Sequence, residues 1–72
     1  MSNGTFAASL ERLIEEKGIT QKELGDAIGT TQAAISGYVR GAKPKIDMAI
    51  KIADYFGVSV YDMVSMPPVE NE

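Results

Sequence analysis

Two helix signals stand very close together in the middle of the chain, and this spacing restricts the fold more than any other feature. A helix that follows Thr20 meets a stop at Gly29, since glycine readily takes the left-handed conformation that ends helices. The next helix can begin at Gln32, because Thr31 is a good N-cap residue. Helices joined by so short a connection must cross steeply, with their near ends almost in contact. The sequence therefore predicts a steeply crossed pair of helices.

A steep crossing needs particular residues at two positions, and the sequence provides both. The second helix passes against the fifth residue of the pair, which must be small, and this residue is Gly25. The ninth residue needs a positive φ angle at the turn, and it is Gly29. Apolar residues on the inner side are expected to attach the pair to the rest of the domain: Leu24, Ile28, Ile35 and Tyr38.

Capping signals mark the helix boundaries. Thr20 and Glu23 form a capping box, and Ile19 with Leu24 forms the matching hydrophobic staple. Asp47 is expected to cap the fourth helix. The expected helices span residues 5–17, 21–28, 32–40, 48–56 and 60–65. Apolar residues at helical spacing give the predicted core: Phe6, Leu10, Leu13, Ile14, Leu24, Ala27, Ile28, Ile35, Tyr38, Met48, Ala49, Ile52, Ala53, Phe56 and Met63.

The predicted architecture is a compact, all-α domain of five helices. No segment shows the sustained alternation of apolar and polar residues that is typical of a strand. The Pro-Pro pair at 67–68 cannot continue a helix. We therefore expect one domain over residues 1–66 and a disordered tail over residues 67–72.

The composition argues against several classes of protein. The 72 residues include no cysteine and no histidine, which removes disulfides, thiolate metal sites and the commonest general base. Carboxylates are present without a nucleophile–base pair or a glycine-rich phosphate loop, so neither an enzyme nor a cofactor or metal site is expected. No apolar run approaches the length of about 20 residues that spans a bilayer, and the N-terminus lacks the pattern of a signal peptide. A cytoplasmic protein without membrane contact is the default expectation.

The net charge of −3 counts against nucleic-acid binding, but the charges are unevenly distributed. Between residues 40 and 51, four basic residues stand against Asp47 alone. The acidic residues gather elsewhere, at Glu11, Glu15, Glu16, Glu70 and Glu72. A chain that is acidic overall can therefore still present a locally basic face.

The ordered set of motifs resembles the helix-turn-helix of the lambda-repressor-like (Xre/Cro-type) family of bacterial and phage regulators. The resemblance extends over residues 6–64. Any one motif is weakly specific, whereas the whole set at family spacing is strongly so. The motifs are Glu-Lys-Gly at 16–18, Ile-Thr-Gln at 19–21, Gly-Thr-Thr-Gln at 29–32, Ile-Ser at 35–36, Arg-Gly at 40–41, Lys-Ile-Ala at 51–53 and Phe-Gly-Val-Ser at 56–59.

This resemblance implies a DNA-reading surface within residues 20–45, with the third helix in the major groove of double-stranded DNA. By position, the expected contacts to bases come from Thr31, Gln32, Ala33, Ser36 and Gly37. Gln32 would read a base, most naturally adenine. The expected contacts to phosphates come from Gln21, Lys22, Arg40, Lys43 and Lys45.

The chain departs from the family on the reading face. Ala33 and Gly37 stand where family members often carry a long polar or basic side chain. Either few bases are read directly, or close backbone approach and DNA shape carry more of the specificity. Plainer interpretations also exist: the glutamines as ordinary exposed helix residues, Arg40 paired with a carboxylate, and Lys43 and Lys45 as a solvated loop.

The predicted function is that of a transcriptional regulator, a repressor that binds a palindromic operator as a homodimer, with no small-molecule ligand. Dimer contacts would come from Val58, Val60, Tyr61, Val64 and Met66, which a short last helix cannot all bury internally. Packing of these residues onto the first helix is the alternative, and a monomer that pairs only on DNA is a third possibility. The competing function is a protein-interaction module, of antitoxin or antirepressor type, which kept the fold and lost strong DNA binding.

Overall fold

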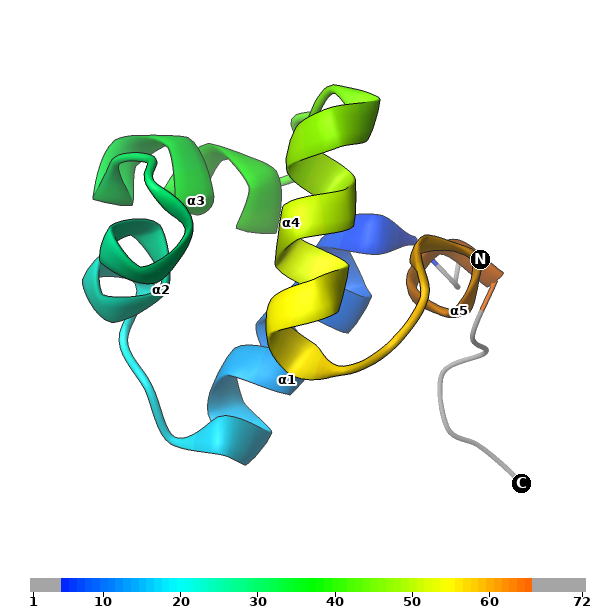
Figure 1. Cartoon of the computed structure of the whole chain (residues 1–72), viewed down its shortest axis with the longest axis horizontal. Helices are drawn as coiled ribbons and strands as arrows, with labels where there is room; N and C mark the ends of the chain where they lie inside the picture. The colour runs from blue at the N-terminus through cyan, green and yellow to red at the C-terminus, as the bar shows by residue number, and fades with distance from the viewer. Residues whose placement is uncertain (1–4, 66–72) are drawn as a thin grey trace.

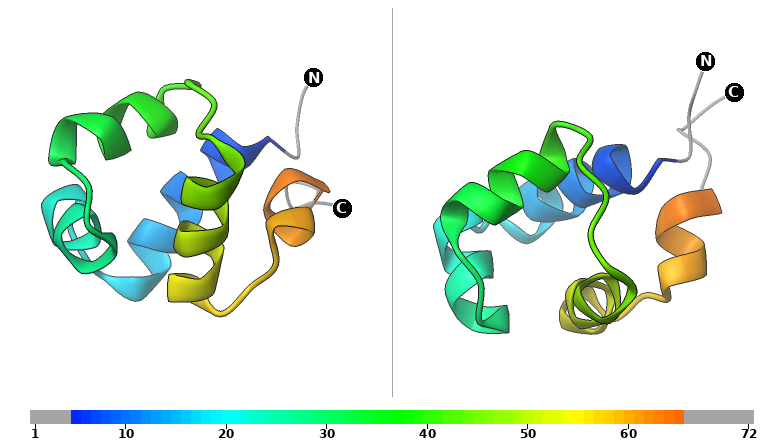
Figure 2. Two further views of the ribbon diagram at one scale, coloured as in Figure 1. Left: turned by 45° about the horizontal axis from the view of Figure 1, so that its top comes forward. Right: turned by 90° about the horizontal axis from the view of Figure 1, so that it is seen from above.

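A computed structural model describes residues 5–65, and these residues form five α-helices and no strand (Figure 1). The helices α2 and α3 lie on one side and α5 on the other, with α1 and α4 between them (Figures 1 and 2). The prediction of an all-α domain is confirmed. The helices are α1 (Phe6–Lys17), α2 (Gln21–Ile28), α3 (Gln32–Val39), α4 (Ile46–Phe56) and α5 (Val60–Ser65).

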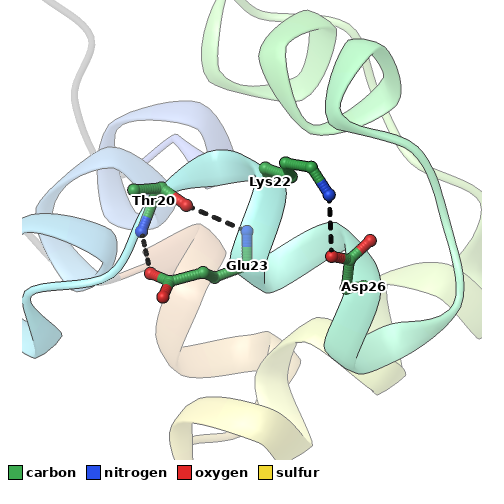
Figure 3. A network of polar contacts seen from close by, with 4 residues as sticks. All are labelled: Thr20, Lys22, Glu23 and Asp26. Carbon is green, nitrogen blue, oxygen red and sulfur yellow. Dashed lines mark hydrogen bonds and ion pairs between the residues drawn. The ribbon is translucent and has the colours of Figure 1, made fainter.

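Side-chain caps begin α1, α2 and α3. Thr5 Oγ1 accepts from the Ala8 amide at 3.1 Å, and Thr31 Oγ1 accepts from the Ala34 amide at 3.0 Å. The predicted capping box of α2 is present in both directions: the Glu23 amide donates to Thr20 Oγ1 at 3.0 Å, and the Thr20 amide donates to Glu23 Oε1 at 2.8 Å (Figure 3). These bonds satisfy amides that have no partner inside the helix.

The start of α4 differs from the prediction. Its N-cap is Lys45, which makes no side-chain cap bond, and the helix begins at Ile46 rather than at Met48. Asp47 lies in the first turn instead of capping it, where its charge complements the helix dipole. The helix α4 is stable without a side-chain cap because Ile52 and its neighbours on the inner face are buried, and this burial contributes stabilising free energy.

Each helix contributes one fully buried large side chain to the core. The packing of these five apolar residues replaces the disulfides and metals that small domains often need, since burying each one stabilises the fold by about 1.5–3 kcal/mol. Ala27 was expected in the core but is exposed, because it lies on the outer face of α2. In the order α1 to α5, the five residues are Leu10, Leu24, Ile35, Ile52 and Met63.

A buried hydrogen bond joins α1 to α5. Ser9 is the one buried polar residue within the described range, and its hydroxyl donates to the Met63 carbonyl oxygen at 2.6 Å. The residue four positions after Met63 is Pro67, which has no N–H to donate to this carbonyl. The Ser9 hydroxyl therefore takes the place of a helical donor that the sequence cannot supply.

Replacing Ser9 by alanine is expected to lower the free energy of unfolding by about 1–3 kcal/mol, because the buried Met63 carbonyl loses its partner. The measurement is urea denaturation followed by circular dichroism. Ser65→Ala is the matched control, since the Ser65 hydroxyl makes the same kind of bond to Tyr61 in an exposed position. The control should change the stability by less than about 0.5 kcal/mol. Equal losses in both variants would show that burial of this bond is unimportant.

Candidate nucleic-acid interface

The crossing of α2 and α3 depends on Gly25. This residue is buried, and a Cβ atom added to it would lie 3.1 Å from the carbonyl oxygens of both Thr30 and Thr31. The carbonyl of Gly25 also accepts from the amides of Gly29 and Thr30, at 2.9 and 2.8 Å. Backbone atoms cannot swing away as a flexible side chain does, so this position favours glycine and strains any larger residue. Gly29 has a φ angle of 84°, and both predictions for the turn are confirmed.

The first residues of α3 form an exposed polar surface. Thr31, Gln32 and Ala33 are consecutive and exposed, whereas Ile35, one turn farther along the helix, is fully buried. Ile35 holds the helix against the domain core. The structure brings together three of the five predicted base-contacting residues at the helix end that the turn leaves free.

Farther along α3, the predicted contacts Ser36 and Gly37 are half-buried and Arg40 is exposed. Arg40 Nη2 donates to Ser36 Oγ at 3.1 Å. Within the described residues the partner of Arg40 is therefore this hydroxyl, and its predicted alternative pairing with a carboxylate does not occur. Within residues 5–65 no carboxylate pairs with Arg40, which keeps its positive charge available for a phosphate.

Gly37 has no steric need to be glycine, in contrast to Gly25. An added Cβ would meet only Ala42 Cβ, at 3.9 Å, which is ordinary van der Waals contact. Replacement by alanine is therefore expected to raise the free energy of unfolding, by up to about 1 kcal/mol, through the better helix propensity of alanine. Urea denaturation tests this expectation. A loss of stability would mean that the backbone at this position needs glycine for a reason other than space.

The start of α2 carries the predicted contacts Gln21 and Lys22. Gln21 is the first residue of the helix and is half-buried, and its position beside the free amides of the first turn suits an anion. Lys22 Nζ forms an ion pair with Asp26 Oδ2 at 3.1 Å (Figure 3). Both side chains are about two-thirds exposed, at 69% and 67%, so the pair is weak and a phosphate can compete for the lysine.

The loop between α3 and α4 holds the predicted phosphate contacts Lys43 and Lys45. Both are exposed. The ion pairs found within residues 5–65 join other side chains, Arg12 with Glu16 and Lys22 with Asp26. The two lysines therefore keep their full charge toward solvent. With Arg40 they make the basic part of the surface that the sequence predicted.

Sequence reasoning missed two side-chain contacts on this surface. Asp26 pairs with Lys22, and Ser36 accepts from Arg40. Both pairs have i,i+4 spacing, which places side chains next to each other on a helix and could have revealed them. The missed contacts matter because each one occupies a group that is expected to meet DNA.

Burial divides the residues that were predicted to form a dimer interface. Val58 and Val60 are half-buried against the core, as the alternative of internal packing expected. Tyr61 and Val64 remain exposed, with 74% and 46% of their surface accessible. Met66 lies outside the described residues.

Comparison with known protein families agrees with the geometry of α2 and α3. A helix-turn-helix family model matches residues 10–63, which is more than half of the chain. The chain belongs to the lambda-repressor-like helix-turn-helix family. This family assignment makes it a DNA-binding transcription regulator of the Xre type. No curated protein and no solved structure matches the chain.

Two further features of the described residues concern membranes and metal ions. No helix within residues 5–65 is long and apolar enough to cross a membrane. The same residues contain no group of three or more acidic side chains placed to hold a metal ion.

Proposed function

We propose that this helix-turn-helix protein is a sequence-specific transcriptional repressor that acts in the cytoplasm and places α3 in the major groove of double-stranded DNA. The observation that carries this proposal is the exposed start of α3, where Thr31, Gln32 and Ala33 face outward while Ile35 anchors the helix. Gln32 offers the amide that reads adenine through its N6 and N7 positions. Thr31 and Ala33 offer methyl groups to thymine.

Basic and polar groups on both sides of α3 support a grip on the DNA backbone. Gln21 stands at the start of α2, whose amides and dipole favour a phosphate. Arg40 follows α3, and Lys43 and Lys45 lie in the next loop, all exposed and without an ion pair in the described residues. This local charge answers the objection that the net charge of −3 raises.

The proposed repressor reads a palindromic operator as a homodimer. A two-fold pair of α3 helices fits half-sites that lie about one turn of DNA apart, roughly 34–36 Å. The exposed side chains of Tyr61 and Val64 on α5 support a contact between copies, because exposed aromatic and apolar residues are typical of interfaces. Pairing that occurs only on DNA satisfies the same proposal.

The competing function is a protein-interaction module that does not bind DNA strongly. The small side chains at Ala33 and Gly37 favour it, because they leave part of the reading face without a group that reaches a base. The two functions differ in their response to salt, since only the release of counterions from phosphates makes affinity fall steeply with salt.

Selection of bound sites from random double-stranded DNA tests the repressor proposal. The expected result is an inverted repeat whose half-sites are about 10 base pairs apart from centre to centre, or a multiple of that spacing. Enrichment of a single, non-repeated site would overturn the homodimer. The absence of any enriched sequence would overturn sequence-specific binding itself.

A further inference from the structure

An apolar groove lies where α1 begins and where α5 meets the start of α4, and it includes Lys43, one of the proposed phosphate contacts. Its volume is about 440 Å³. Figure 2 shows the three chain segments that surround it: the first turn of α1, the loop that leads into α4 together with the first turn of that helix, and α5. Apolar side chains line most of it, and Lys43 supplies the charge at its edge. The apolar lining residues are Phe6, Pro44, Ile46, Ala49, Val60 and Val64.

The groove is unfilled apolar surface. Ile46 is 67% exposed and Val64 is 46% exposed, although both side chains are large and apolar. Such exposure next to a concave surface marks a place where another apolar segment is stabilised by burial. A segment that docks there must have chemistry that matches the groove.

We propose that residues 66–72 of this chain dock in the groove. Met66, Pro67, Pro68 and Val69 supply an apolar segment, and Glu70 and Glu72 follow it. A segment whose apolar part lies in the groove carries its acidic part to the edge, where Lys43 stands. The apolar and charged parts of the segment thus match the apolar lining and the charged edge of the groove.

The position of the segment in the chain favours this intramolecular contact. Met66 is two residues after Val64, which itself lines the groove. Seven residues reach at most about 25 Å, whereas the described domain measures 24 by 21 Å across its two shorter axes. Because the segment is attached at the groove, its effective concentration there is in the millimolar range, which exceeds that of a free partner.

The two prolines also lower the cost of docking. Proline favours an extended, polyproline-type backbone, so Pro67 and Pro68 have less conformational freedom to lose when the segment is bound. A second copy fits the groove less well, since a two-fold contact would set one concave surface against the same concave surface. Val64 lines the groove and Tyr61 does not, so docking covers Val64 and leaves Tyr61 as the exposed residue for the proposed dimer.

Docking has a consequence for DNA binding, and this consequence rests on the proposed function. Lys43 is one of the residues that we expect to hold a phosphate, and the docked Glu70 and Glu72 compete for the same charge. Binding of DNA and docking of residues 66–72 therefore weaken each other, as linkage between two ligands of one group requires.

Nuclear magnetic resonance spectroscopy of the full chain without DNA tests the docking itself. We expect nuclear Overhauser contacts between the Val69 methyl groups and the Phe6 ring. Val69→Asp should remove them and shift the amide signals of Ala49 and Val60. Asn71→Asp is the matched control, because it adds the same charge to the same segment but keeps the apolar side chain, and it should leave those signals unchanged. Circular dichroism checks that both variants keep their helical content.

Two results would overturn the docking proposal. The first is the absence of these contacts together with signal changes that stay within a few residues of position 69. The second is a shift of the groove signals with protein concentration in the unmodified chain, because it would show that a second copy occupies the groove.

A separate titration with double-stranded DNA tests the competition. Both variants add one negative charge, so electrostatic repulsion from DNA is the same in each. Val69→Asp should nevertheless bind DNA about three- to tenfold more tightly than Asn71→Asp, because it has lost the docked state. Equal affinities would overturn the competition. If neither variant binds DNA, the proposed function fails, while the resonance data still decide whether the segment docks.

Discussion

Replacing Gly25 by valine is expected to lower the free energy of unfolding by about 3 kcal/mol and to abolish DNA binding. The added Cβ would start 3.1 Å from the backbone of Thr30 and Thr31, and the two γ carbons would extend beyond it. Overpacking of this kind costs about 1–3 kcal/mol, and here the neighbours are backbone atoms that cannot rotate away. The turn can relax only by moving α3, which displaces the exposed residues at its start.

The test compares three variants by urea denaturation and by DNA binding. Gly25→Ala is the milder change, since the gain in helix propensity of about 1 kcal/mol offsets part of the strain. It should keep the fold and still weaken DNA binding, which separates the position of α3 from global unfolding. Gly37→Ala is the matched control for the stability measurement alone, because the same substitution meets only an ordinary van der Waals contact there. If Gly25→Val proved as stable as the unmodified protein, the close crossing of α2 and α3 would be wrong.

Replacing Gln32 by alanine is expected to reduce specific DNA binding by about 5- to 150-fold and to leave non-specific binding nearly unchanged. An amide that bonds a base in two places discriminates by about 1–3 kcal/mol, and each 1.4 kcal/mol is a factor of ten in affinity. Stability should hardly change, since Gln32 is exposed and makes no capping bond. The measurement is a pair of titrations, with the selected site and with unrelated DNA.

Gln21→Ala provides the matched control for Gln32. It removes the same side chain from the start of the neighbouring helix, where a phosphate contact is expected. Its loss should therefore weaken binding to both kinds of DNA by the same factor, because phosphates carry no sequence information. An equal loss on both DNAs in the Gln32 variant would mean that Gln32 does not read a base.

Local signals in the sequence predicted the parts of the fold that depend on neighbouring residues. The capping box of Thr20 and Glu23, the tight position of Gly25 and the positive φ angle of Gly29 are requirements of one short segment, and all were found as expected. The fully buried Leu10, Ile35 and Ile52 follow from helical periodicity. In these cases a few residues contain the whole physical reason.

Features that depend on distant parts of the chain could not be predicted in this way. The bond between Ser9 and Met63 spans 54 positions, and nothing near Ser9 indicates its partner. The helix α4 begins at Ile46, before Asp47 and without a side-chain cap, so the N-cap signal of Asp47 did not mark its start. The groove beside Val64 arises where three segments meet, so no local pattern announces it.

The candidate surface also combines features that could be predicted from the sequence with features that could not. Thr31, Gln32 and Ala33 are exposed, as residues predicted to contact bases must be, whereas Ser36 and Gly37 are half-buried. What the surface reads remains a prediction, because base recognition depends on the distance from a side chain to DNA.

Titration of the full chain with double-stranded DNA at about 50 mM and about 200 mM salt tests DNA binding most directly. We expect binding at the lower concentration. If Lys22, Arg40, Lys43 and Lys45 all meet phosphates, raising the salt should weaken the affinity about a hundredfold, as counterion release requires. The absence of binding near 50 mM salt, or an affinity that does not change with salt, would contradict a DNA-binding function for this surface.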